Sequence, residues 1–399
     1  MTPTHDSRRN SPSLRRAIAS STADVVVIGG GPIGLASAWR LAQAGLRVTV
    51  CDPTPGGGAA DVAAGMLAPV SEAHFGEEAL LRLNLASAGQ WPGFAREVEA
   101  ASDMPVDYRP IGSVVVAFDA DDHAALLELH RYQDELGLDS RRLRGRECRQ
   151  LEPMLAPGVR SGLLATQDAA VDPRTLCRAL LVACERAGVA VRREEAAVRW
   201  EGDRVSGVQF PNGAALASGV VVLAAGARSS TVRDLPPDAR PPVRPVKGQI
   251  LTLRGSVDRP LITHAVRGMV KGATAYLVPR VDGRILIGAT VEERGWDEEV
   301  TGGAVYELMR DATLLVPGVS ELAFVEARVG FRPGSPDNAP MIGAGAVEGL
   351  VVATGHYRNG ILLTPVTAEA IAATVADGEP TAAALPFSPL RFAPAGVGR

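Results

Sequence analysis

Apolar runs and helical patterns alternate at the start of the chain. Residues 24–28 (DVVVI) form a short apolar run that predicts a buried strand, and a run of glycines follows at once. A helical pattern (GLASAWRLAQAG) comes next, and a second apolar strand at residues 47–51 (RVTVC) leads to Asp52. This strand–helix–strand order predicts the first unit of a parallel sheet.

Two hairpins are predicted further along the chain. Residues 205–210 and 220–224 are strand-like and flank an Asn-Gly turn, and residues 275–280 and 284–290 flank an Asp-Gly turn. The remaining elements expected from the pattern are helices at residues 77–101, 121–136, 171–188 and 361–376, and strands at residues 112–118 and 349–353.

The alternation of these blocks predicts an α/β (α+β) fold of two domains, because parallel units and hairpin-rich stretches take turns along the chain. A doubly wound Rossmann domain that binds a nucleotide is expected from three separate segments, and a mostly antiparallel domain from the segments between them. The predicted ranges are 23–90, 150–235 and 328–385 for the first domain, 91–149 and 236–327 for the second, with a disordered tail at 1–22 and a C-terminal tail at 386–399.

Composition narrows the class of protein. The chain has 399 residues with 46% hydrophobic and 22% charged positions, and its net charge of −4 gives no reason to expect a nucleic acid or membrane partner. Four cysteines without a CxxC pair fit a reducing cytoplasm, and six scattered histidines predict no metal site.

The strongest motif is a glycine-rich turn, residues 29–34 (GGGPIG), which matches GxGxxG between a strand and a helix. Gly29 permits the tight turn, Gly31 lets the backbone approach a pyrophosphate, and Gly34 allows the helix to pack closely. Asp52 lies 23 residues after Gly29 and can accept hydrogen bonds from a ribose diol. The pattern predicts dinucleotide binding; a glycine-rich connector is the alternative.

Two further segments favour FAD over a nicotinamide dinucleotide. Residues 220–230 (VVVLAAGARSS) form a late strand that ends in Ala-Ala-Gly, and two-domain FAD enzymes of the glutathione-reductase-like group use such a strand. Residues 56–69 (GGGAADVAAGMLAP) are small and glycine-rich, so they can lie flat against a flavin and offer backbone N–H groups. A packed loop is the alternative for this second segment.

Seven motifs together give the chain a family resemblance. They are GGGPIG, AAGMLAP, PVKG, YLVPR, GAT, GFRPG and GHYRNGILLTP, in that order over about residues 23 to 380. The chain resembles the FAD-dependent amine oxidases of the D-amino-acid oxidase superfamily, and within them the bacterial glycine oxidases of thiamine biosynthesis. The resemblance implies a glutathione-reductase-like FAD-binding domain, a substrate domain with a mostly antiparallel sheet, and non-covalently bound FAD.

The resemblance also implies the site residues. Arg332 would bind the substrate carboxylate with two parallel hydrogen bonds, and Arg358 and Tyr276 would lie on the substrate side. No side chain is expected to act as acid or base, and His356 is expected to pack in the turn near the flavin. The residues implied for FAD are Gly29, Gly31, Pro32, Ile33, Gly34, Asp52, Pro53, Ala64, Gly65, Met66, Ala197, His356, Tyr357, Arg358, Asn359, Gly360, Ile361 and Leu362.

The turn before the last helix has a physical reason to face the flavin. Free N–H groups and the helix dipole collect at a helix N-terminus, so amides of residues 359–362 would stabilise negative charge on the reduced ring. Two positions depart from similar enzymes: residues 59–62 (AADV) stand where Ser or Thr is usual, and Asp52 stands where Glu is common.

The implied activity is oxidation of glycine, sarcosine or a small D-amino acid to an imine and then glyoxylate, with molecular oxygen reduced to hydrogen peroxide. The imine would supply the thiazole branch of thiamine biosynthesis, and similar enzymes are often homo-oligomers, with tetramers among them. Two alternatives stay open: a D-amino-acid or proline dehydrogenase of the same fold that passes electrons to a quinone, and a flavin-binding interaction protein without turnover.

Overall fold

The computed structural model describes residues 23–270 and 273–392, so the predicted tail at 1–22 lies outside the described residues. A six-stranded sheet has the order β18-β19-β12-β1-β2-β8, and it is parallel except for β18. Its strands are β1 (Val25–Ile28), β2 (Val48–Cys51), β8 (Ala190–Arg192), β12 (Val220–Leu223), β18 (Met341–Ala344) and β19 (Leu350–Thr354). The predicted parallel sheet is therefore confirmed.

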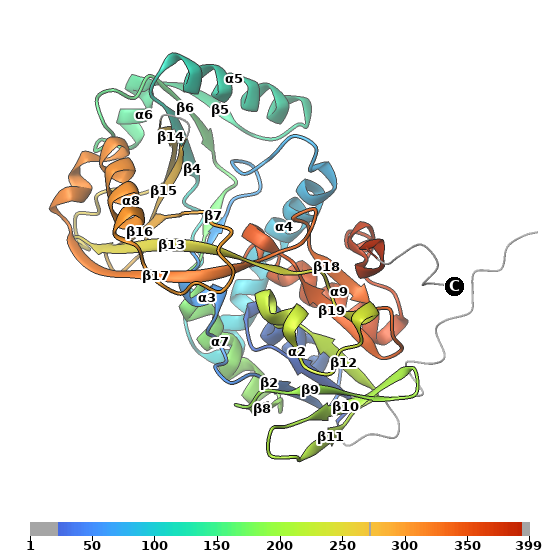
Figure 1. Ribbon diagram of the computed structural model, residues 1–399. Helices are drawn as coiled ribbons and strands as arrows, with labels where there is room; N and C mark the ends of the chain where they lie inside the picture. The colour runs from blue at the N-terminus through green and yellow to red at the C-terminus, as the bar shows by residue number, and fades with distance from the viewer. Residues whose placement is uncertain (1–22, 271–272, 393–399) are drawn as a thin grey trace, which may run out of the picture.

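Alternate side chains of β1 enter two different cores. Val25 and Val27 pack with helices on one face, and Val26 and Ile28 pack with a small antiparallel sheet on the other. The helices of the first face are α2 (Pro32–Gln43), α4 (Glu78–Ser102), α7 (Pro173–Arg186) and α9 (Thr364–Asp377). The small sheet consists of β9 (Ala197–Glu201), β10 (Arg204–Gln209) and β11 (Ala215–Ala217), near the bottom of Figure 1.

The hairpin predicted between residues 205–210 and 220–224 is wrong. β10 pairs with β9 and β11, whereas β12 lies between β1 and β19 in the parallel sheet. The reason is burial: all four residues of β12 are buried, as a central parallel strand covered on both faces requires. The short segment β11 closes the hairpin after the turn instead.

A second sheet of eight strands forms the upper part of Figure 1, in the order β17-β13-β16-β15-β14-β4-β6-β5. Its pairs are antiparallel except β14 with β4, and the predicted β15–β16 hairpin is confirmed. The strands are β4 (Ser113–Ala117), β5 (Arg141–Arg144), β6 (Ser161–Ala165), β13 (Arg244–Arg254), β14 (Ala265–Val270), β15 (Ala273–Pro279), β16 (Arg284–Gly288) and β17 (Ala323–Gly334).

The two faces of this sheet have different partners. Residues such as Leu251, Leu277 and Ile287 pack on α8 (Gly302–Leu315), which covers the outer face. The opposite face turns toward the segment that follows β2, because Ile250, Val278 and Leu286 pack with Ala64. That segment contains α3 (Ala59–Val62), which lies between the two sheets in both views, and β3 (Met66–Leu67), which pairs with β7 (Ala169–Ala170).

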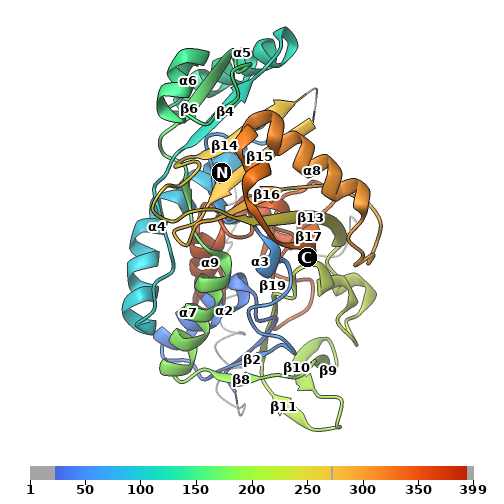
Figure 2. The same ribbon diagram turned by 90° about the vertical axis from the view of Figure 1, so that its left-hand side faces the viewer.

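The remaining elements are short or peripheral. Helices α5 (Ala120–Glu135) and α6 (Gly145–Leu151) lie by β4–β6 at the end of the second sheet (Figure 2). The 3-10 helices are η1 (Gly226–Thr231), η2 (Pro237–Ala239), η3 (Pro317–Glu321), η4 (Tyr357–Asn359), η5 (Leu385–Phe387) and η6 (Pro389–Phe392).

Several elements lie across the predicted domain ranges. β6 at residues 161–165 and the start of β17 at residue 323 belong to the eight-stranded sheet, and α4 continues to Ser102 within the core around β1. Residues 386–392, expected as part of a tail, include η6 and the end of η5, and Phe387 is buried. The predicted boundary at residue 385 thus falls within η5.

The glycine-rich turn packs against its own helix at one point and is open at another. A Cβ atom on Gly34 would lie 2.0 Å from the carbonyl oxygen of Gly29, whereas a Cβ on Gly31 would meet nothing within 4 Å. Gly34 therefore allows the helix to pack closely on the turn, and Gly31 borders open space, as the motif predicts.

Gly34→Ala should destabilise the cofactor-free protein by about 1–3 kcal/mol, because the new methyl group overlaps backbone atoms that cannot move aside easily. Gly31→Ala should change its stability by less than about 0.5 kcal/mol. Denaturant unfolding of both variants measures the difference, and equal losses would contradict this account of the turn.

Candidate active site

The glycine-rich turn and Asp52 form one hydrogen-bonded unit at the carboxyl ends of β1 and β2. Gly29 has a φ of +114°, and a Cβ there would lie 2.3 Å from the carbonyl oxygen of Ala224 in the late Ala-Ala-Gly segment. Asp52 accepts hydrogen bonds from the N–H of Gly30 at 2.6 Å and of Thr54 at 2.7 Å. The Asp52 carboxylate therefore fixes the backbone of the glycine-rich turn to the segment that follows β2.

The N-terminus of α2 fits a phosphate group. Pro32 is its first residue, Ile33 and Gly34 follow, and no side chain caps the helix. The backbone N–H groups of the first turn are thus left for a ligand, and the helix dipole favours a negative one. Pro53 follows Asp52, and the structure places Ala197 at the start of β9, where it pairs with Gln209.

The segment around Ala64 and Gly65 presents backbone donors next to the eight-stranded sheet. The carbonyl oxygen of Gly65 accepts a hydrogen bond from Val171 N–H at 2.9 Å, and that of Ala64 accepts one from Arg280 Nη2. Within residues 23–270 and 273–392, the N–H groups of both residues donate to no protein acceptor. Met66 follows in β3. Because the amides of Ala64 and Gly65 are free, the segment can offer them to a flat ring.

Arg280, the last residue of YLVPR, fixes this segment and was not assigned a role from the sequence. Its side chain is buried, and burial lowers the pKa of its guanidinium to about 10. Nε lies 3.9 Å from the carboxylate of Asp172, which caps α7 through the N–H of Arg174 at 2.9 Å. Arg280 thereby links β15, α7 and the carbonyl of Ala64.

Asp61 replaces the expected hydroxyl side chain with a salt bridge. Its carboxylate lies 3.1 Å from Arg174 Nε and 2.5 Å from Arg328 Nη1. The side chain therefore ties α3 to α7 and β17, where Ser or Thr is usual in similar enzymes. This is the structural counterpart of the departure seen at residues 59–62.

The turn between β19 and α9 supplies free amides at three of the four predicted positions, because the N–H of Asn359 instead donates to the carbonyl oxygen of His356 at 2.9 Å. The N–H groups of Gly360, Ile361 and Leu362 donate to no acceptor in the described part of the chain, although Ile361 and Leu362 are buried. The carbonyl oxygen of Leu362 accepts hydrogen bonds from Ser87 Oγ at 2.6 Å and Trp91 Nε1 at 2.8 Å. Helix α4 thus holds the turn in place while its N–H groups stay available, and buried free amides are rare without a ligand.

His356 is buried in this turn and has a neutral ring. Its Nε2 lies 3.1 Å from Thr367 Oγ1 of α9, and burial lowers its pKa to about 3. Tyr357 and Asn359 follow in η4. The histidine therefore packs the turn against α9, and its low pKa makes it a weak base.

Arg332 and Tyr276 are brought together on the inner face of the eight-stranded sheet. Cβ atoms built on two glycines would collide with them: one on Gly248 would lie 2.5 Å from Arg332 Nη1, and one on Gly288 would lie 2.2 Å from the Tyr276 hydroxyl oxygen. Arg332 Nη1 also donates to the carbonyl oxygen of Thr290 at 3.0 Å. Burial raises the pKa of Tyr276, and the charge of Arg332 opposes this rise, so the phenol stays protonated.

Arg358 points to an acidic partner that sequence reasoning missed. Its Nη2 donates to Glu77 at 2.5 Å and lies 3.2 Å from His74 Nδ1. Its Nε is buried and has no partner among the described residues. The predicted substrate role of Arg358 stays a prediction.

A second ion pair beside Tyr276 was also missed. Arg267 of β14 stands directly opposite Tyr276 of β15 in the sheet register, and its Nη1 donates to Glu72 Oε1. Both side chains are largely buried, with 11% and 14% exposure. No local pattern in the sequence marks this pair, because the two residues are 195 positions apart.

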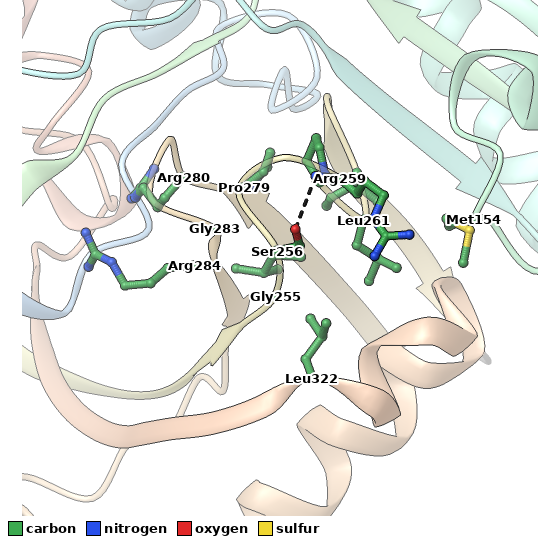
Figure 3. Close-up of a pocket in the computed structure, with 13 residues that line it drawn as sticks. Met154, Gly255, Ser256, Arg259, Leu261, Pro279, Arg280, Gly283, Arg284 and Leu322 are labelled. Carbon is green, nitrogen blue, oxygen red and sulfur yellow. Dashed lines mark hydrogen bonds between the residues drawn. The ribbon is translucent and has the colours of Figure 1, made fainter.

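A pocket of about 440 Å³ opens elsewhere on the second domain, next to the β15–β16 turn (Figure 3). Its lining includes Met154, Leu261 and Leu322, and the side chains of Arg280 and Arg284 extend away from the others in the view. Arg332 and Tyr276 do not line it, so this pocket is separate from the candidate site.

Metal-binding clusters and membrane-spanning helices are both absent from the described ranges. Residues 23–270 and 273–392 contain no group of three or more His, Cys, Asp or Glu side chains that could hold a metal ion. No helix in the same ranges is both long enough and apolar enough to cross a membrane.

The arrangement defines a class of protein: a two-domain protein with the architecture of dinucleotide-binding enzymes, in which a parallel sheet carries the glycine-rich turn and a larger sheet faces it. The family model described as DAO, FAD dependent oxidoreductase, matches residues 24–374. The chain belongs to this family.

Individual proteins of this family are similar to the chain over most of its length. The chain is 34% identical over 379 residues to the bifunctional protein ThiO/ThiG of Synechocystis. The aligned region covers 93% of this chain and 54% of that protein. The chain thus spans about half the length of this relative. It is 32% identical over 372 residues to a glycine oxidase of Geobacillus kaustophilus, covering 92% and 96% of the two chains. The crystal structure of glycine oxidase from G. kaustophilus superposes with a TM-score of 0.85 at 30% identity over 95% of this chain and all of the other.

Because the His356 pKa falls from 6.5 to about 3 on folding, the unfolded chain binds one more proton between these values. The free energy of unfolding should therefore decrease as the pH falls below about 6.5. At pH 5 the loss due to this histidine is about 2 kcal/mol. Unfolding of the wild type and of His356→Gln at pH 7.5 and pH 5 measures it, and an equal pH dependence in both proteins would refute the assignment.

Proposed function

We propose that the protein is an FAD-dependent amine oxidase that converts glycine, or another small amine acid such as sarcosine or a small D-amino acid, to its imine. The imine hydrolyses to glyoxylate and ammonia, or supplies the thiazole branch of thiamine biosynthesis. The glycine oxidase and ThiO/ThiG relatives support this choice of substrate and setting. Four buried, free cysteines suit a reducing cytoplasm, and we expect a homo-oligomer.

One observation carries the proposal. Four arginines lie on the inner face of the eight-stranded sheet or in the turn before α9, and three of them have acidic partners: Arg267 has Glu72, Arg328 has Asp61, and Arg358 has Glu77. Arg332 has no carboxylate partner among the residues that the structure describes. A guanidinium that is left uncompensated beside a protonated tyrosine is suited to bind the carboxylate of an amino acid.

The chain's own residues position the substrate and the cofactor. Arg332 binds the carboxylate and the Tyr276 hydroxyl donates a hydrogen bond to it, which fixes the orientation of the α-carbon. The amides of Gly360 to Leu362, and those of Ala64 and Gly65, would hold the flavin, and the N-terminus of α2 would hold the pyrophosphate. When bound, FAD supplies the acceptor for the hydride of the α-carbon and passes the electrons to oxygen.

An anaerobic absorbance titration of the purified holoprotein with glycine tests the function. We expect glycine to bleach the flavin band, and admitted air to restore it with release of hydrogen peroxide. Sarcosine, D-alanine and D-proline are tested next in the same way. Reduction without reoxidation by air, but with reoxidation by a quinone, would favour the dehydrogenase alternative, and bound FAD that no amine reduces would contradict an enzymatic role.

Arg332→Ala should raise KM for the amino acid at least about 100-fold and leave FAD bound, because a charged partner of the substrate carboxylate is lost. Steady-state kinetics and the flavin absorbance of the purified variant measure both. Arg310→Ala, which removes an arginine of α8 that pairs with Asp311, is the matched control and should keep the wild-type KM. An unchanged KM in Arg332→Ala would exclude this residue as the carboxylate anchor.

A further inference from the structure

One loop supplies a carboxylate to each of two arginines. Residues 70–77, here called the acid loop, follow β3 and contain Glu72 and Glu77. Glu72 pairs with Arg267 of β14, and Glu77 pairs with Arg358 of the turn before α9. The acid loop therefore compensates two arginines that come from two distant parts of the chain.

The Glu72–Arg267 pair is the one next to Tyr276. Arg267 and Tyr276 are directly opposite each other in neighbouring antiparallel strands, so their side chains leave the same face of the sheet. The charges of Glu72 and Arg267 both act on the Tyr276 hydroxyl, as does that of Arg332. The pair thus borders the space in which Arg332 and Tyr276 would hold the substrate carboxylate.

The charges of this group match one substrate carboxylate. Arg267 and Arg358 are each paired with a carboxylate of the acid loop, and Arg332 is the one of these three arginines without a carboxylate partner among the described residues. A second carboxylate on the substrate would meet an arginine that is already paired, together with the negative charge of Glu72. Like charges brought together in a largely buried site are costly, and such repulsion is an effective way to reject a ligand.

We propose that Glu72, through its pair with Arg267, makes the site selective for amino acids that carry a single carboxylate and excludes dicarboxylic amines. Removal of the Glu72 charge frees Arg267 and admits a second carboxylate. This inference rests on the proposed function, because it assumes that Arg332 binds the first carboxylate.

One other acidic group lies near Arg267. Asp168 is buried, which raises its pKa to about 6, and the charge of Arg267 acts on it in the opposite direction. Its Oδ1 accepts a hydrogen bond from Val70 N–H at 3.2 Å, and its buried Oδ2 has no hydrogen-bond partner among the described residues. Glu72, and not Asp168, is the acid that bonds directly to the Arg267 guanidinium.

The test compares the wild-type holoprotein with Glu72→Gln, which keeps the size of the side chain and removes its charge. Perturbation of the flavin absorbance gives the affinities for acetate and malonate, which are not oxidised, and turnover gives kcat/KM for glycine and iminodiacetate. We expect the preference for the monocarboxylate to fall at least about tenfold in both measurements. Glu97→Gln, which breaks the surface pair with Arg40, is the matched control and should keep the wild-type ratio.

A double variant assigns the effect to Arg267. Glu72→Gln combined with Arg267→Met lacks the freed cation, so the gain in dicarboxylate binding should disappear. An unchanged malonate-to-acetate ratio in Glu72→Gln, or a gain that persists in the double variant, would overturn the inference. The binding measurement needs no turnover, so a shifted ratio in a protein that no amine reduces would support the inference and refute the proposed function.

A second single variant keeps the inference testable if Glu72→Gln does not fold. Arg267→Met leaves the charge of Glu72 unpaired beside Tyr276, so acetate should bind several-fold more weakly and KM for glycine should rise more than kcat falls. Wild-type acetate affinity in this variant would overturn the role of the pair.

Discussion

Compensation of the positive charge on the inner face of the eight-stranded sheet is the constraint on which the contact between the two domains depends. The inner face of the eight-stranded sheet carries Arg267, Arg328 and Arg332, and an uncompensated charge in such an interface is expensive. The acids that pair with the first two, Glu72 and Asp61, come from the segment that follows β2. Close approach of the two domains is therefore tied to the ion pairs, and Arg332 is left without a carboxylate partner among the described residues, as the proposed carboxylate site requires.

The same segment also links the cofactor side to the substrate side. Arg280 of β15 bonds to the carbonyl of Ala64, and the neighbouring amides are left without protein acceptors. The turn before α9 follows the same scheme, since Ser87 and Trp91 hold the carbonyl of Leu362 while the N–H groups stay free. In both places side chains of the protein donate to the backbone carbonyl oxygens, and backbone N–H groups stay free. This arrangement suits a ligand rich in acceptor atoms, such as a flavin.

Local signals explain what the sequence could predict. The glycine-rich turn and the β15–β16 hairpin each follow from a few neighbouring residues, and the structure contains both. The partner of β12 could not be read in this way, because an apolar strand fits either a hairpin or a parallel sheet and distant strands decide between them. The pairs Glu72–Arg267 and Glu77–Arg358 join residues 195 and 281 positions apart, so no spacing rule identifies them.

The position of β12 between β1 and β19 has a consequence for how the chain is made. On a ribosome, β1 and the glycine-rich turn emerge early, but their neighbour β12 follows some 190 residues later and β19 later still. The parallel sheet therefore stays incomplete, with an unpaired apolar edge, until β19 has been synthesised. A nascent chain arrested before residue 350 would expose that edge, which makes β19 decisive for escape from aggregation.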